Sequence, residues 1–271
     1  LQLLSANQML AKQGLLGIAF SEEDGGQGGT LMHAVLAIQE VALVCPKSAD
    51  IVQAGNFGPI RTFVEYATPE QKKRFLPDLL GGRKLISLGM TEPDAGSAVT
   101  ELKTSARQEG DHYIINGTKW WTTGAMDERC KILIVMGKTN PDADDHHQQS
   151  MILVPIDTPG VKVIRNLTVL GYVDQHGHAE ISFTNVKVPA SNLIGKEGEG
   201  FALAQARLGP GRIHHCMRAI GMAERALQLM IKRSMVRTPF GKELARQGVI
   251  QEWIAQARID IEQARLLVLK A

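Results

Sequence analysis

The chain has 271 residues, of which 44% are hydrophobic and 21% charged, with a formal net charge of +2. This size and composition allow two or three packed layers around a core. The near-neutral charge predicts no strong attraction to nucleic acid or to a membrane surface, and no apolar stretch approaches the roughly 18 to 20 residues that cross a bilayer. Three widely spaced cysteines without a CxxC pair indicate neither a disulfide framework nor a zinc site, so a reducing compartment fits best.

Residues 1–84 carry apolar side chains at spacings of three and four, which is typical of amphipathic helices. One run consists of Leu31, Val35, Ile38 and Val41, and another of Phe63, Tyr66, Phe75 and Leu79. Thr68 and Pro69 are expected to open the last helix of this region as its N-cap and first-turn residues. We therefore expect a helical N-terminal domain over residues 1–84.

In residues 85–198 the apolar period changes to two, which predicts β-strands. Strands are expected at residues 102–106, 112–115, 131–135, 151–156 and 178–183, with a polar loop at 139–149. Asn116-Gly117 predicts a tight hairpin, because both central positions of that turn favour positive φ. These residues form the expected middle β domain.

Helical periodicity returns in residues 199–271. A short helix is expected from Gly200 to Leu208, and a long one after Gly209, with Pro210 in its first turn. A second long helix runs to Ala271 without a stop signal, and Leu1 already lies in a helical pattern, so we expect a fragment whose first and last domains are truncated. Helices, then strands, then helices indicate an α+β fold rather than a doubly wound parallel sheet.

Several patterns have plain structural interpretations. The glycine clusters at residues 25–29 and 195–200 lack a phosphate-loop motif and contain or adjoin acidic residues, so turns are favoured. The pairs His146-His147 and His214-His215 have no third ligand at a useful spacing, and no metal site is expected. No GxSxG elbow is present, and Cys216 has no partner that marks a nucleophile.

Two segments do not fit a purely structural role. Residues 90–97, Met-Thr-Glu-Pro-Asp-Ala-Gly-Ser, lie at the end of an expected strand and include small and hydroxyl residues. Their free N–H and O–H groups can face a ligand. In residues 119–123, Lys-Trp-Trp-Thr-Thr, neighbouring tryptophans on a strand face opposite ways, so at least one lies outside the core of the other. An aromatic wall beside hydroxyl donors suits a flat heteroaromatic ring.

In this order and spacing the chain resembles the acyl-CoA dehydrogenase family. The matching motifs are T-E-P-D-A-G-S at 91–97, I-N-G-x-K-x-W-x-T at 115–123, V-K-V-P at 186–189, G-E-G-F at 198–201 and R-x-x-F-G at 237–241. The wording G-P-G-R-I-H-H-C at 209–216 is similar to the subgroup fused to phosphotransferase-like domains. The resemblance implies three domains that enclose FAD and an acyl-CoA: a helical domain, a β domain, and the start of a C-terminal helical bundle.

The resemblance also implies roles for individual residues. FAD contacts are expected at Leu88, Met90, Thr91, Ser97, Trp121, Thr122, Thr123 and Arg237. Substrate contacts are expected at Ser97, Gly209, Gly211 and Arg212, where a helix N-terminus could favour an anion or an enolate-like oxygen. Arg237 matches an arginine that reaches the FAD pyrophosphate of a neighbouring subunit, which implies a homodimer or homotetramer.

The implied reaction removes the α proton of the thioester while a hydride leaves Cβ, and gives a trans-2-enoyl-CoA. The catalytic base remains unidentified. Most of the family supply a glutamate from a segment expected beyond Ala271, and a minority place it where this chain has Gly211. Pro239 and Gly248 also depart from the family pattern, which puts part of the adenosine contact in doubt.

Several alternatives stay open at this point. The scaffold also serves acyl-CoA oxidases and flavin monooxygenases, and a truncated chain could be inactive and keep only flavin or subunit contacts. Electron-transfer flavoprotein is the expected electron acceptor. The expected location is a bacterial cytoplasm or a mitochondrial matrix, without secretion or membrane insertion.

Overall fold

The computed structural model describes residues 5–173 and 176–271. Five helices come first: α1 (Ala6–Lys12), α2 (Leu31–Val44), α3 (Pro46–Ala54), α4 (Pro59–Tyr66) and α5 (Pro69–Leu80). The predicted start of α5 is confirmed, with Pro69 in the first turn. The Thr68 hydroxyl accepts a hydrogen bond from the Gln71 N–H, and the Gln71 side chain accepts one from the Thr68 N–H, at 3.2 and 2.9 Å.

The strands that follow form one mixed sheet in the described part of the chain. They are β1 (Leu85–Gly89), β2 (Ser105–Glu109), β3 (His112–Thr123), β4 (Cys130–Lys138), β5 (Gln149–Pro155), β6 (Val161–Asn166), β7 (His178–Pro189) and β8 (Leu193–Ile194). Their order is β6-β7-β3-β2-β4-β5-β8, with β1 paired to β4. Only β1 and β2 run parallel to β4, and the other pairs are antiparallel. Short 3₁₀ turns lie at Val99–Glu101 and Ala190–Asn192.

The predicted hairpin at Asn116-Gly117 is wrong. Strand β3 continues through these residues, and Gly117 pairs with Phe183 of β7. A side chain at Gly117 would collide with Thr104, so the glycine allows a close approach of two segments instead of a turn. The hairpin that joins β2 to β3 lies at residues 110–111, where Gly110 has a φ of 59°.

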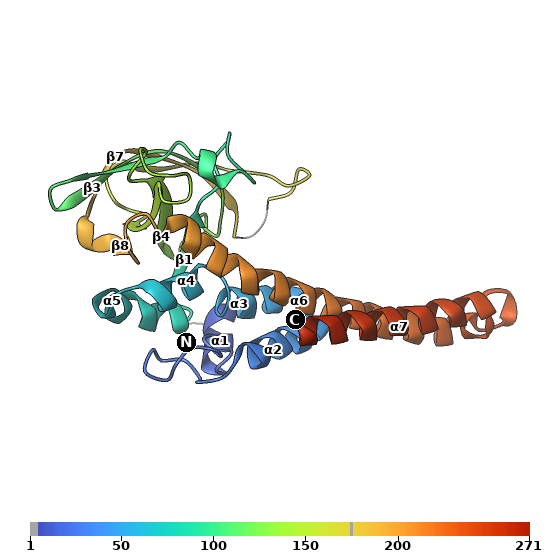
Figure 1. Ribbon diagram of the computed structural model, residues 1–271. Coiled ribbons are helices and arrows are strands. Elements are labelled where there is room, and N and C mark those ends of the chain that lie inside the picture. The colour runs from blue at the N-terminus through green and yellow to red at the C-terminus, as the bar shows by residue number, and fades with distance from the viewer. Residues whose placement is uncertain (1–4, 174–175) are drawn as a thin grey trace.

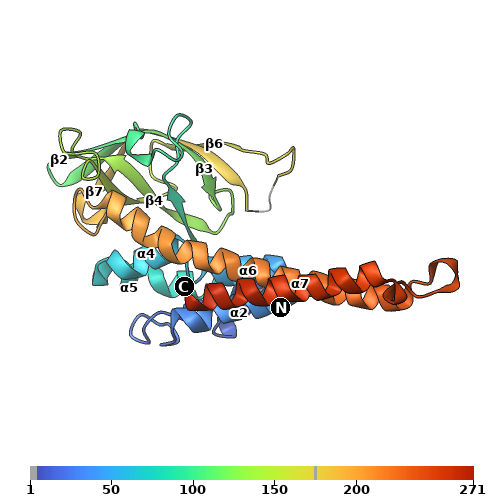
Figure 2. The same ribbon diagram turned by 45° about the vertical axis from the view of Figure 1, so that its right-hand side comes forward.

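Two long helices complete the chain. Helix α6 runs from Gly200 to Val236 and α7 from Gly248 to Lys270, with 3₁₀ turns Pro239–Gly241 and Leu244–Arg246 between them. Figures 1 and 2 show them as an antiparallel hairpin that begins beneath the sheet and projects well beyond the rest of the molecule. Among the residues that the structure describes, no helix is both long and apolar enough to cross a membrane.

The predicted break before Pro210 is also wrong, because α6 is continuous through this residue. Pro210 offers no N–H, so the carbonyl four residues earlier loses its helical partner. Packing on both sides outweighs that cost. Leu203 is buried against the sheet and α4, whereas Met217 and Ile220 are buried among α2 and α3.

Three buried clusters hold these layers together. The first joins one face of the sheet to α4, α5 and the start of α6, and its members include Phe63, Leu79, Ile134 and Leu203. The second fills the other face of the sheet, with Ile115, Val154, Ile181 and Val186. The third joins α2, α3, α6 and α7. This arrangement confirms the predicted α+β class.

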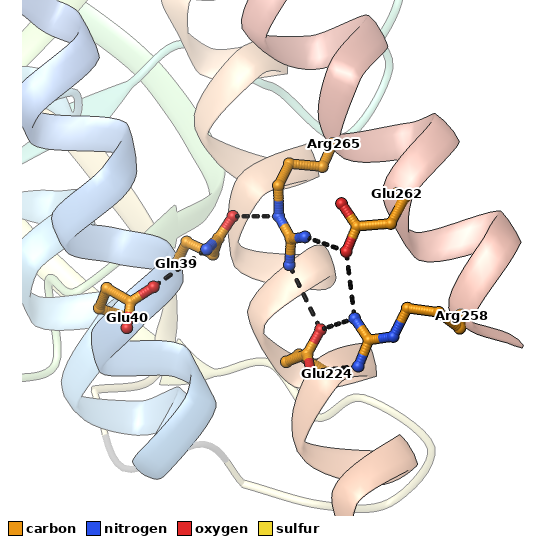
Figure 3. A network of polar contacts seen from close by, with 6 residues as sticks. All are labelled: Gln39, Glu40, Glu224, Arg258, Glu262 and Arg265. Carbon is orange, nitrogen blue, oxygen red and sulfur yellow. Dashed lines mark hydrogen bonds and ion pairs between the residues drawn. The ribbon is translucent and has the colours of Figure 1, made fainter. Parts of the chain in front are cut away.

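Polar contacts fix α7 against α6 and α2 (Figure 3). The Arg258 guanidinium of α7 donates to both carboxylate oxygens of Glu224 of α6, at 2.7 and 2.8 Å. Arg265 donates to Glu262 at 2.6 Å and to Glu224 at 3.3 Å, and also to Gln39 of α2 at 3.2 Å. The network therefore links α6 and α7 to α2, which lies far from both in the sequence.

Candidate functional site

The two segments singled out in the sequence meet at one place. The backbone N–H of Trp120, in β3, donates to the carbonyl of Thr91, just after β1, at 2.8 Å. Met90 and Leu88 are half-buried and pack against the first hydrophobic cluster. The end of β1 and the end of β3 therefore form one continuous edge.

A buried ion pair fixes this edge. The Lys119 ammonium, which is 0% exposed, donates to Glu92 at 2.7 Å and to the carbonyl of Met90 at 3.1 Å. Glu92 in turn accepts from the backbone N–H groups of Lys103 and Thr104, at 2.7 and 3.0 Å. The carboxylate of the T-E-P motif thus ties three segments together and is unavailable as a base.

Burial and the charge of the partner shift the pKa values of Glu92 and Lys119 in opposite directions. Burial alone would raise the pKa of Glu92, but the Lys119 ammonium and the hydrogen bonds outweigh it and leave that pKa below its usual value. Burial lowers the pKa of Lys119 to about 8, although Glu92 opposes the shift. Near neutral pH the pair is ionised, and its charges are satisfied locally.

The two tryptophans depart from the expected alternation. The pairing of β3 with β7 is irregular between Lys119 and Thr122, and Trp121 has a φ of 56°. This bulge brings the rings of Trp120 and Trp121 into an edge-to-face contact, with centroids 5.2 Å apart. The expectation that they face opposite ways is therefore wrong, because a β-bulge resets the direction of the side chains. The Trp121 side chain is left 37% exposed at the edge.

Hydroxyl groups and one histidine lie beside Trp121. The Thr123 hydroxyl is 3.0 Å from Nδ1 of His178 in β7, and the His178 ring is 5.7 Å from that of Trp121. The Thr122 hydroxyl is buried and has no hydrogen-bond partner among the residues that the structure describes. His178 was not singled out from the sequence. Its only signal was its position on a strand opposite Thr123, and that requires the register of β3 and β7.

These residues fit a flat heteroaromatic cofactor such as a flavin. An exposed indole in a fixed orientation provides a stacking surface, and the neighbouring backbone and Thr123 provide polar contacts at its rim. Ser97 is exposed in the turn that follows a short bridge between Glu92 and Ala95. It is close in sequence to this edge, and its predicted contact stays a prediction.

The other predicted substrate residues lie in α6, outside the strand edge. Gly209, Gly211 and Arg212 are in the interior of the helix, about two to three turns after its start at Gly200. The expectation of a helix N-terminus at this point is therefore wrong, since the N–H groups here are not those of a first turn. Side-chain atoms at Gly209 would meet nothing within 4 Å, so this glycine lines open space.

Arg237 is not brought to the strand edge within one chain. It is the C-cap of α6, at the far end of the projecting helical hairpin (Figure 1). Phe240, in the turn that follows, has a φ of 55° and a fully exposed ring. Arg237 is therefore remote from the strand edge of its own chain, and its predicted flavin contact stays a prediction.

A cavity of about 350 Å³ lies away from this edge, beside the α2–α6–α7 network. Three charged groups around it, Glu224, Arg258 and Arg265, are paired with one another, and a fourth, Glu40, accepts a hydrogen bond from Gln39 at 3.0 Å. This cavity therefore has a structural explanation, and the strand edge remains the stronger candidate for function.

Comparison with known proteins matches three consecutive parts of the chain to one family. Residues 5–83 match the N-terminal domain of acyl-CoA dehydrogenases, residues 87–186 the middle domain, and residues 198–271 the C-terminal domain. FadE2 of Mycobacterium tuberculosis, which is named as an acyl-CoA dehydrogenase, is 58% identical over 219 residues, or 80% of this chain and 54% of FadE2. The chain thus spans about half the length of that relative.

Solved structures give the same result. One from Mycobacterium abscessus, described as an acyl-CoA dehydrogenase, has a TM-score of 0.87 and 39% identity, and the match covers 98% of this chain and 66% of that one. Butyryl-CoA dehydrogenase from Megasphaera elsdenii has a TM-score of 0.88 and 32% identity, with coverage of 97% and 69%.

The class of protein that the fold defines is therefore one built as helices, a sheet and further helices, as in the acyl-CoA dehydrogenases. This chain belongs to the acyl-CoA dehydrogenase family, which confirms the resemblance of its motifs. The finer likeness to the subgroup with phosphotransferase-like domains stays a prediction.

Proposed function

We propose that this chain is the flavin-binding part of an FAD-dependent enzyme that converts an acyl-CoA to its trans-2-enoyl-CoA. The observation that carries the proposal is the meeting of the β1 and β3 ends, where Trp121 is exposed beside backbone and hydroxyl groups in a member of this family. When bound there, FAD would supply a hydride acceptor next to the thioester.

The residues of this chain would hold the reactants in place. Met90, Thr91 and Thr123 would make polar contacts along one edge of the flavin ring, and Trp121 would cover part of its surface, with Leu88, Ser97 and Thr122 as further contacts. The Glu92–Lys119 pair would keep this wall at a fixed distance, because it fixes Met90 and the strand that carries Trp121. Gly209, Gly211 and Arg212 would border the thioester from α6.

Removal of the α proton requires a carboxylate with a raised pKa in a dry place. Gly211 occupies the position where part of the family keeps this base, and Glu92 is ion-paired. Glu199 accepts a hydrogen bond from the Lys196 N–H at 3.0 Å, at the start of α6. We propose that the base is supplied from outside residues 1–271.

Arg237, at the tip of the helical hairpin, is proposed to contact the flavin of a second subunit in a homodimer or homotetramer. The electrons are proposed to pass to an electron-transfer flavoprotein. Both statements rest on family membership and on the position of Arg237 far from the strand edge of its own chain.

The test is an anaerobic titration of the FAD-loaded chain with butyryl-CoA, followed by flavin absorbance. We expect the flavin bands to shift on binding without bleaching, because the thioester reaches the flavin but the proton has no acceptor. Free CoA, as the control, should cause a smaller shift. Bleaching would contradict the proposed place of the base, and a spectrum that is unchanged by butyryl-CoA would contradict the thioester function.

A further inference from the structure

One stretch of α6 carries polar groups that neither the core nor the strand edge explains. It lies between Ala204, in the first hydrophobic cluster, and Met217, in the third. Arg207 and His214 are seven residues apart, so they lie on one face of the helix two turns from each other, with Gly211 between them. Gly211 carries no side chain between them, and a Cβ at this position would lie 3.9 Å from the Nε2 atom of His214.

Arg207 has no counter-ion in the part of the chain that the structure describes. Its Nε atom is buried without a hydrogen-bond partner, and burial lowers the pKa of its guanidinium with no opposing acidic group. Arg218, three turns further along α6, shows the usual solution, since it pairs with Asp50 of α3. A half-buried guanidinium whose Nε atom is shielded from water and has no anion is unfavourable, so its position requires another explanation.

His214 is the second group without a partner. Its side chain is 4% exposed, and its Nδ1 atom has no hydrogen bond among the described residues. The ring packs against Phe57, with centroids 4.9 Å apart, and against His215 at 4.3 Å. Burial, together with the charges of His215 and Arg207, lowers the pKa of His214 to about 3, so it is a neutral ring with one N–H to donate.

We propose that Arg207 and His214 form a subsite for an oxyanion, a carboxylate or a phosphate group, carried by the acyl part of the thioester substrate. A guanidinium and an imidazole N–H on one face suit such a group, because both donate and one is charged. The proposal rests on the proposed function for the thioester and narrows its substrate to acyl groups that bear a negative charge.

The surroundings favour the acyl chain as the source of the anion. Phe57, which contacts His214, also lines an apolar cavity of about 150 Å³ together with Pro210, Ile213 and Val268. Phe57 thus links this apolar space to the His214 ring, and such a space suits an acyl chain with a charged group better than a free nucleotide phosphate. CoA and FAD also carry phosphates, so the test must separate these sources.

The first measurement follows the ¹⁵N signal of His214 in the FAD-loaded chain, assigned with His214→Gln. Sodium glutarate and sodium phosphate are titrated against sodium chloride at equal ionic strength. We expect a saturable shift with either oxyanion and none with chloride, because a bound oxyanion accepts a hydrogen bond from the neutral ring of His214. If neither oxyanion moves the signal, the subsite is contradicted. This titration does not depend on thioester binding, so it tests the anion subsite independently of the proposed function.

The second measurement compares the affinities of glutaryl-CoA, butyryl-CoA and free CoA by calorimetry. We expect glutaryl-CoA to bind at least about tenfold more tightly than butyryl-CoA, as one charge-assisted hydrogen bond allows. Arg207→Met should reduce this preference to less than about twofold, and Arg207→Lys should retain part of it. Arg225→Met, an exposed arginine on the same helix, is the control that should leave the preference unchanged.

Equal binding of the two thioesters by the wild type would overturn the proposal, as would an equal loss of both in Arg207→Met. A His214 shift with free CoA as large as that with glutaryl-CoA would assign the anion to a CoA phosphate and overturn the acyl source. A shift with glutarate but no binding of any thioester would keep the anion subsite and contradict the proposed function.

Discussion

Lys119 is a charged residue at a fully buried position of a strand, and its partner Glu92 lies on a different segment. We predict that Glu92→Gln lowers the free energy of unfolding by about 3 to 5 kcal/mol, because it leaves a buried ammonium without its carboxylate. Urea denaturation at pH 7 measures this. Asp94→Asn is the matched control, since its ion pair with Lys103 is exposed and should contribute less than about 1 kcal/mol. Equal small losses for both variants would contradict the proposed role of the pair.

His214 should make the stability of the chain depend on pH. Its pKa is lowered to about 3 in the folded chain, whereas the unfolded chain has the ordinary value near 6.5. Below pH 6.5 the unfolded state therefore binds a proton that the folded state does not, and stability falls by up to about 1.4 kcal/mol for each pH unit down to about 3.

The measurement is urea denaturation of the wild type and of His214→Gln at pH 7.0 and 5.0. We expect the wild type to lose more stability than the variant between these two values. Burial, with the charges of His215 and Arg207, keeps the ring neutral by lowering its pKa. Identical losses for the two proteins would show that His214 is solvated or paired.

At the scale of single residues, sequence reasoning found Trp121 and Thr123 but not how they are arranged. Alternation along a strand predicts opposite faces for two neighbouring tryptophans, and a bulge with positive φ at Trp121 cancels it. The Glu92–Lys119 pair and His178 depend on which segments lie side by side. No spacing within the sequence encodes that information.

At the scale of elements, the helices and strands were largely predicted by hydrophobic period, whereas two boundaries were not. In the sequence, Pro210 predicts the start of a helix, but the buried residues on both sides of it keep α6 continuous. In the sequence, Gly117 predicts a turn, but in the structure it allows the close approach of Thr104. In both places long-range packing outweighs a local preference.

The docking of α7 is the prediction that belongs to this scale. Glu224 accepts from Arg258 and Arg265, and these hydrogen bonds hold the pKa of Glu224 below its usual value. We predict that Glu224→Gln speeds amide hydrogen exchange across α7, with a cost of about 0.5 to 1 kcal/mol because Arg258 remains partly in water. Glu243→Gln, in an exposed pair with Arg246, is the control. Unchanged exchange in α7 would contradict the role of the network.

The lowered pKa of Glu224 also predicts in which direction the docking of α7 changes with pH. A group with a lowered pKa in the folded state stabilises above its unfolded pKa, and that contribution is lost as pH falls through its folded value. The α7 amides of the wild type should therefore lose protection in mild acid, below about pH 4.5. Glu224→Gln should lose less protection over the same range.

At the scale of the whole molecule, the order of helices, sheet and helices was predicted. The family resemblance also implied that Arg237 serves a neighbouring subunit, but the size of its separation from the strand edge comes from the structure. That distance follows from the length of α6 and its continuity past Pro210. It places Arg237 far from the strand edge of its own chain, and its contact with the flavin of a neighbouring subunit stays a prediction.

We predict that Arg237→Ala lowers both FAD affinity and the fraction of oligomer, because one phosphate contact and one subunit contact are lost together. Light scattering after size exclusion and bound-flavin absorbance measure the two effects. Lys242→Ala, an exposed cation near the same tip, should change neither. If Arg237→Ala has the FAD affinity and the oligomer fraction of the wild type, Arg237 is only a solvated cation at a helix end.

The central claim is that the joined ends of β1 and β3 hold the flavin ring, and the most direct measurement is calorimetric titration of the purified chain with FAD. We expect the wild type to bind FAD and Trp121→Ala to bind it at least about tenfold more weakly, because the stacking surface is lost. Trp253→Ala, an exposed tryptophan on α7, should bind like the wild type. Equal FAD affinity in Trp121→Ala and the wild type would contradict the site.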